Sequence, residues 1–117
     1  MITNNNSMKA CIEKCWECRT ECQDVLFNYC LQEGGAHADM AHVKVMTDCT
    51  QICQISADFM VRNSELHSIA CAACAEICDA CATNCETLNG EEMTYCAKLC
   101  RECAQSCRSM VGDKIRC

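Results

Sequence analysis

The sequence lacks several features that mark common classes of protein. It contains no proline, four glycines, and aromatic residues at only 4% of its 117 positions. Without proline no helix has to be interrupted, so breaks must come from glycine, asparagine and serine. No run approaches the roughly 20 apolar residues of a membrane-spanning helix, so we expect no membrane partner.

The beginning of the chain and its charge exclude further classes. Residues 1–7 have neither a basic start nor an apolar stretch, so they resemble no signal or transit peptide, and we expect a cytoplasmic protein. The net charge is −6 without a basic patch, so we expect no nucleic acid partner. We find no Ser/His/Asp arrangement, no phosphate-binding loop and no paired carboxylates in an apolar setting, and we predict that the protein is not an enzyme.

Cysteine is the residue that the sequence has in abundance, at 17 positions. Sixteen fall on helical spacing, mostly in steps of three and four residues, which keep side chains on one face of an α-helix. Soluble proteins normally place core leucines at this spacing, so the sequence predicts a helical bundle filled with thiols. The sixteen are Cys11, Cys15, Cys18, Cys22 and Cys30; Cys49 and Cys53; Cys71, Cys74, Cys78, Cys81 and Cys85; and Cys96, Cys100, Cys103 and Cys107.

Three breaks divide the chain into four helical segments. They are Gly34-Gly35, Asn63-Ser64 and Asn89-Gly90, with Ser7 and Ser64 as expected N-caps. We predict helices over about residues 8–32, 37–62, 65–88 and 91–111, followed by a short tail that holds Cys117. Short connections favour antiparallel neighbours, so the predicted fold is one all-α domain over residues 1–117, an up-down-up-down four-helix bundle with a cysteine-lined core.

Methionine and histidine extend the stripes of cysteine toward both ends of such a bundle. On the second helix, His42 and Met46 share the face of Cys49 and Cys53, and His67 precedes Cys71 by one turn. The antiparallel arrangement sorts these residues into two ends. The His42 end gathers Met40, His42, Met46, Cys30 and Met93, and the His67 end gathers Met8, Met60, His67 and Met110. Thioether and imidazole groups are weaker ligands than thiolate, which suits the entry and transfer of a soft metal.

Two alternatives to a copper site stay open. A disulfide-stabilised helical scaffold is typical of short cysteine-rich chains, but the odd number of cysteines and the absence of a visible secretory signal count against it. Neighbouring cysteines on one helix are also poor disulfide partners, because their Cβ vectors run nearly parallel. A thiolate cluster of zinc or another soft metal is the second alternative, and zinc would need four ligands drawn from several helices.

Cu(I) fits the pattern best. It accepts two thiolates in a near-linear arrangement, and Cβ atoms at positions i and i+4 lie about 5–6 Å apart. When thiolates bridge, about one Cu(I) per cysteine leaves the core neutral, whereas zinc–thiolate clusters keep negative charge that is costly to bury. The pairs with this spacing begin at Cys11, Cys18, Cys49, Cys74, Cys81, Cys96 and Cys103.

These cysteine pairs on four helices resemble the bacterial copper storage proteins, which are four-helix bundles that hold Cu(I) in a cysteine-lined core. The resemblance covers about residues 8–111 and is closest to the cytosolic branch of that family. It implies multiple Cu(I) ions, copper donor or acceptor proteins as partners, and a homo-oligomer, expected as a tetramer. The predicted metal ligands are the sixteen cysteines named above together with His42, Met46 and His67.

Overall fold

Helices make up almost all of the described chain. The structure, a computed structural model, describes residues 2–112, and for residues 2–6 the backbone alone. Cys117 and the rest of the predicted tail lie outside the described residues. The elements are α1 (Ile2–Val25), the π-helix η1 (Leu26–Cys30), α2 (Leu31–Glu33), the 3₁₀-helix η2 (Gly35–Ala38), α3 (Met40–Val61), α4 (His67–Cys85) and α5 (Glu91–Ser109).

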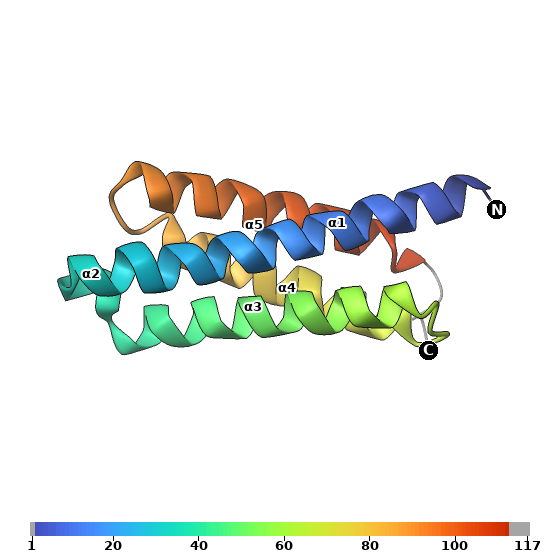
Figure 1. Ribbon diagram of the computed structural model, residues 1–117, viewed down its shortest axis with the longest axis horizontal. Coiled ribbons are helices and arrows are strands. Elements are labelled where there is room, and N and C mark those ends of the chain that lie inside the picture. Colours follow the sequence, from blue (N-terminus) through green and yellow to red (C-terminus); the bar gives the residue numbers. More distant parts are fainter. Residues whose placement is uncertain (1, 113–117) are drawn as a thin grey trace.

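Four antiparallel rods form the bundle, which confirms the predicted fold class (Figure 1). The first rod runs without a break through α1, η1 and α2, and the others are α3, α4 and α5. In cross-section α1 lies beside α3, α3 beside α4, α4 beside α5, and α5 beside α1. The described chain is elongated, with extents of 47 × 26 × 18 Å, and no helix within residues 2–112 has both the length and the apolar character needed to cross a membrane.

Glycine and asparagine end the helices where the sequence predicted breaks. Gly34, with a φ of 73°, follows the last residue of α2. Asn63 adopts a φ of 54° after α3, and the N–H groups of Asn63 and Ser64 donate to the carbonyls of Met60 and Phe59, both at 2.9 Å. This pair of hydrogen bonds is a Schellman motif, which satisfies the last carbonyl groups of the helix.

The connection before α5 holds the His42 end together. The ring of Tyr29 in η1 lies edge-on to that of His37 in η2, with centroids 5.4 Å apart. His37 Nε2 donates to the carbonyl of Asn89 at 2.9 Å, which ties η2 to the α4–α5 connection. Gly90 has a φ of 117°, which favours glycine, and a Cβ atom there would also meet the hydroxyl of Tyr29.

Of the two predicted serine N-caps, Ser7 was wrong, and Ser64 caps the turn just before its helix rather than the helix itself. Ser7 lies within α1, which begins at Ile2, because no glycine or proline interrupts the chain before Gly34. Ser64 caps a separate turn: its hydroxyl accepts from the N–H of Leu66 at 3.0 Å, and its carbonyl accepts from the N–H of His67 at 3.2 Å. Consequently α4 begins at His67, two residues later than expected.

Candidate metal centre

The inside of the bundle is a column of sulfur atoms. All sixteen cysteines of the described chain have an exposed fraction of 0% and are free thiols. They come from every rod: four from α1, Cys30 from η1, two from α3, five from α4 and four from α5. Alanines such as Ala57, Ala75 and Ala82 fill the space between them, so small side chains let the four helices approach closely.

The sulfur atoms lie in mutual contact, and most of the contacts cross between helices. The distances between neighbouring Sγ atoms run from 3.4 Å for Cys22 and Cys96 to 4.0 Å for Cys18 and Cys49. Pairs four residues apart also meet, with Cys18 and Cys22 at 3.9 Å. The pairing along one helix face that the sequence suggested is therefore only part of a network linking all four rods. No pair within residues 2–112 is a disulfide, since an S–S bond is about 2.05 Å long.

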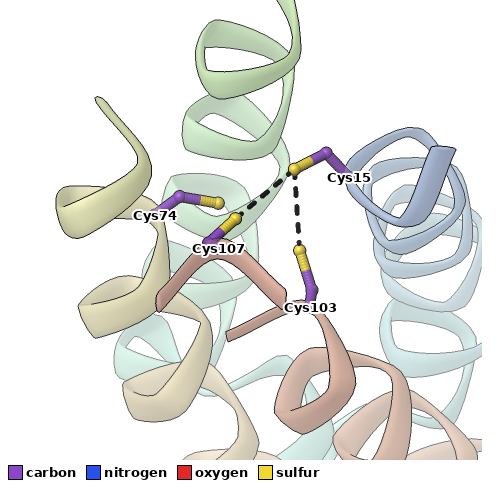
Figure 2. Close-up of side chains that lie close together, drawn as sticks. All are labelled: Cys15, Cys74, Cys103 and Cys107. Atoms are coloured by element: carbon purple, nitrogen blue, oxygen red, sulfur yellow. Dashed lines mark hydrogen bonds between the residues drawn. The ribbon is translucent and has the colours of Figure 1, made fainter. Parts of the chain in front are cut away.

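Three groups of four sulfur atoms are compact enough to surround a metal ion. In the group of Figure 2, Cys15 on α1 lies 3.6 Å from Cys107 and 3.8 Å from Cys103, both on α5, and Cys74 on α4 points at the same centre. Within each group all sulfur atoms lie within 4.8 Å of one another. The other two groups are Cys18, Cys53, Cys78 and Cys103, and Cys18, Cys22, Cys49 and Cys100.

The groups overlap, and their overlap bears on which metal suits the core. Cys18 and Cys103 each belong to two groups, so the three groups use ten different cysteines. Three Zn(II) ions would bring six positive charges to ten thiolates and leave four negative charges in a dry core, which is costly. One Cu(I) ion per thiolate would leave no net charge in the core. The geometry permits tetrahedral coordination, but the charge balance favours a monovalent soft ion.

The environment of the thiols keeps many of them protonated. Burial raises the pKa of Cys30 to about 11. Elsewhere the thiols share protons: the hydrogen bond between Cys103 and Cys107 lowers the pKa of Cys103 and raises that of Cys107. A metal ion that binds these sulfur atoms must therefore displace protons from the thiols whose pKa is raised.

At the His42 end, imidazole and thioether groups meet the thiols. His42, on the first turn of α3, is 2% exposed, and its Nε2 lies 3.2 Å from the Sγ of Cys30. The Cys30 thiol also contacts the Sδ of Met93 at 3.7 Å. Deeper in the bundle, the Sδ of Met46 accepts from Cys81 and Cys85, both at 3.5 Å. Met40, which we assigned to this end, is instead 66% exposed.

A π-helix brings Cys30 into this cluster. On a continuous α-helix, Tyr29 would follow the stripe of Cys22, and Cys30 would lie about 100° away at its edge. The wider turn of η1, Leu26–Cys30, inserts one residue and rotates the chain beyond it. Cys30 is consequently buried and Tyr29 is only partly covered, the reverse of the order expected from the sequence.

The His67 end is built differently. The Nδ1 of His67 bonds to the carbonyl of Ser64 at 2.8 Å, and the ring is partly exposed. Met60 is buried, with 2% exposed, whereas Met8 and Met110 are only partly buried. The sulfur column ends here in Cys71, whose Sγ lies 3.4 Å from the hydroxyl of Ser56. The structure thus brings His42 into contact with a thiol but gives His67 a backbone partner.

Two residues that contact the thiols or His42 were not predicted from the sequence. Ser56, 0% exposed, occupies the stripe position after Cys53 and contacts Cys71 and Cys107. The sequence did contain a signal for Ser56, since it follows Cys53 by three residues and so shares its face of the helix. Asn84, beside Cys85, holds the second ring nitrogen of His42, with Nδ1 and Oδ1 2.5 Å apart. No local spacing pairs residues 42 and 84, so only the packing of α3 against α4 reveals this contact.

Together, the fold and the column of free thiols define a class: a four-helix bundle that binds soft metal ions in its interior. Comparison with known proteins then gives the family. Residues 4–112 match the family model described as copper storage protein, and the chain belongs to that family.

Three relatives illustrate the similarity. The uncharacterized cysteine-rich protein YhjQ of Bacillus subtilis is 36% identical over 77 residues, which are 66% of this chain and 70% of that protein. The Cu(I)-bound copper storage protein BsCsp3 superposes with a TM-score of 0.84 and 34% identity over 91% of this chain and 99% of that chain. The crystal structure of the Nmul_A1745 protein from Nitrosospira multiformis gives a TM-score of 0.87 and 42% identity over 91% of this chain and 95% of that chain.

Proposed function

We propose that this protein stores Cu(I), with many ions held by thiolates along the core of the bundle. Membership of the copper storage protein family and similarity to a Cu(I)-bound member support this function. The proposed ligands are the sixteen cysteines of the core, with His42, Met46 and His67 toward the ends. The observation that carries the proposal is the continuous network of buried free thiols, which extends through the bundle without a single dominant site.

An anaerobic titration of the reduced protein with Cu(I), against a competing chelator of known affinity, tests this function. We expect saturation at about one ion per core cysteine, because bridging thiolates neutralise Cu(I) at that ratio. The same chelator in excess should then withdraw the copper, as storage requires. Saturation at one to four ions would mean discrete sites and would contradict storage.

Copper is proposed to enter and leave at the His42 end. His42, Met46 and Met93 contact thiols there, and neutral imidazole and thioether bind Cu(I) more weakly than thiolate. An ion can bind to such groups, exchange, and pass inward to stronger ligands. At the opposite end, the ring of His67 is partly exposed and bonds to the carbonyl of Ser64 rather than to a thiol, so an ion bound there would have no direct contact with the sulfur column.

Two double variants compare the ends. Replacing His42 and Met46 by alanine should slow both Cu(I) loading and its removal by a chelator by about tenfold, with capacity almost unchanged. The matched control replaces Met60 and His67 by alanine and should have a smaller effect. Stopped-flow absorbance of the copper–chelator complex gives both rates. Slower exchange only in the Met60 and His67 variant would mean that copper loads at the His67 end. Unchanged rates in both variants would mean that these methionines and histidines serve only to pack the bundle.

The remaining parts of the proposal concern the setting of the protein. A reducing cytoplasm would keep sixteen thiols free, which supports a cytoplasmic location. Thiol catalysis requires an exposed, reactive cysteine, whereas the described cysteines are fully buried, so the function we propose is non-enzymatic. Exposed apolar side chains, among them Trp16 and Ile69, support a homo-oligomer, proposed to be a tetramer. Copper donor or acceptor proteins would exchange ions at the loading end.

A further inference from the structure

The contacts of the His42 ring define where its proton lies. His42 is 2% exposed, and each ring nitrogen has one partner: Nδ1 lies 2.5 Å from the Oδ1 of Asn84, and Nε2 lies 3.2 Å from the Sγ of Cys30. An amide oxygen can only accept a hydrogen bond, so Nδ1 carries the proton and donates it to Asn84. The lone pair of Nε2 is then left facing Cys30, whose thiol can donate to it.

Around the Cys30 thiol, three different groups that can bind a soft metal come together. Cys30 from η1 supplies a thiol, His42 from α3 an imidazole, and Met93 from α5 a thioether. The Sγ of Cys30 lies at the centre, 3.2 Å from Nε2 and 3.7 Å from the Sδ of Met93. This arrangement depends on two structural features. The π-helix η1 rotates Cys30 toward the core, and the hydrogen bond with Asn84 orients the ring of His42.

We propose that Asn84 is a positioning residue: its side-chain oxygen fixes the tautomer of His42 with the Nε2 lone pair toward Cys30, whose thiol also contacts Met93, and so sets the rate at which copper crosses this end. The proposal rests on the proposed function. If the proton moved to Nε2, the ring would present a donor to Cys30 and would have no lone pair for a metal there. Histidines that bind metals generally donate their other N–H to an oxygen acceptor, and losing that acceptor costs about 10–100-fold in affinity or activity.

The amide suits this position better than the other groups of the core would. A thiol is a weak acceptor and would hold the Nδ1 proton loosely. The Asn84 oxygen accepts strongly while the side chain stays neutral, so it adds no charge beside a core whose stability depends on charge balance. Asn84 lies on α4, one residue before Cys85, so the same helix supplies core thiols and the orienting group.

The test uses two substitutions and a matched control. Asn84→Leu removes the acceptor at nearly constant size, and Asn84→Asp keeps an oxygen acceptor at the same place. Gln54→Leu is the control, since Gln54 is a side-chain amide on α3 that bonds to Asp58 at the surface, 2.8 Å away. Nitrogen-15 NMR of the reduced, copper-free full-length proteins identifies which ring nitrogen of His42 is protonated, with its signals assigned by their loss in His42→Gln.

We expect the proton on Nδ1 in the wild type, in Asn84→Asp and in the Gln54→Leu control, and a mixture of tautomers in Asn84→Leu. Withdrawal of Cu(I) by a chelator should be about tenfold slower in Asn84→Leu alone, at unchanged capacity. A wild-type proton on Nε2, unchanged exchange in Asn84→Leu, or equally slow exchange in Asn84→Asp would each overturn the proposal. Saturation of the wild type at one to four ions would overturn the proposed function instead, while the nitrogen spectrum still reports the tautomer.

Discussion

Cu(I) loading should raise the melting temperature of the reduced protein by tens of degrees. Each site filled at about a thousand times its dissociation constant adds roughly 4 kcal/mol to the free energy of unfolding. For a domain of this size, about 1 kcal/mol corresponds to roughly 4 °C. A few tightly held ions therefore account for the shift, which differential scanning calorimetry under anaerobic conditions measures.

The copper-free protein should already be helical in the same experiment. Its thiols can pack as small hydrophobic groups in the buried cluster, which supports a helical bundle before copper binds. Far-ultraviolet circular dichroism before and after loading should differ little, and an excess of chelator should return the melting temperature to its starting value. A random-coil spectrum of the copper-free chain would contradict the account, because it would describe a protein that folds around its metal.

Lowering the pH should weaken copper binding by about tenfold per pH unit for each ion. Burial raises the pKa of Cys30 to about 11, so at neutral pH this thiol is protonated and must lose its proton before the thiolate binds. Below the raised pKa, more protons compete as the pH falls, so the apparent affinity falls with it. Competition titrations at several values between about pH 6 and 8 measure the slope.

The slope also separates copper from zinc. A divalent ion bound by four thiolates displaces more protons per ion than a Cu(I) ion that is neutralised by one bridging thiolate, so zinc affinity should fall more steeply. The matched control is therefore a zinc titration of the same protein under the same conditions. An affinity for Cu(I) that does not change with pH would mean that the thiolates exist before the metal arrives, contrary to the burial of Cys30.

The sequence predicted the core because its signal is local. Cysteines such as Cys11, Cys15, Cys18 and Cys22 repeat at the period of a helix, and that period alone decides which side chains share a face. All four are fully buried in the structure. The breaks at glycine and asparagine were equally local, since a left-handed backbone conformation at Asn63 or Gly34 follows from the residue type.

The two ends depend on features that no local pattern contains. Extrapolating the α-helical period put Tyr29 in the core and Cys30 at its edge, and the π-helix η1 reverses them. The contact of Asn84 with His42 joins positions 42 residues apart on two helices. Met40 was assigned by its position near the end of a helix, but it lies just after the connection and remains exposed. These cases depend on how helices pack, which spacing along one helix does not determine.

The most direct test of the central claim, a dry thiolate core neutralised by Cu(I), is native mass spectrometry of the fully loaded protein. The mass reports both the copper ions bound and the protons lost. We expect about one Cu(I) for each of the sixteen buried cysteines, with one proton lost per copper ion. A loaded protein that holds only one to four ions, or that loses clearly more protons than it gains positive charges, would contradict the account.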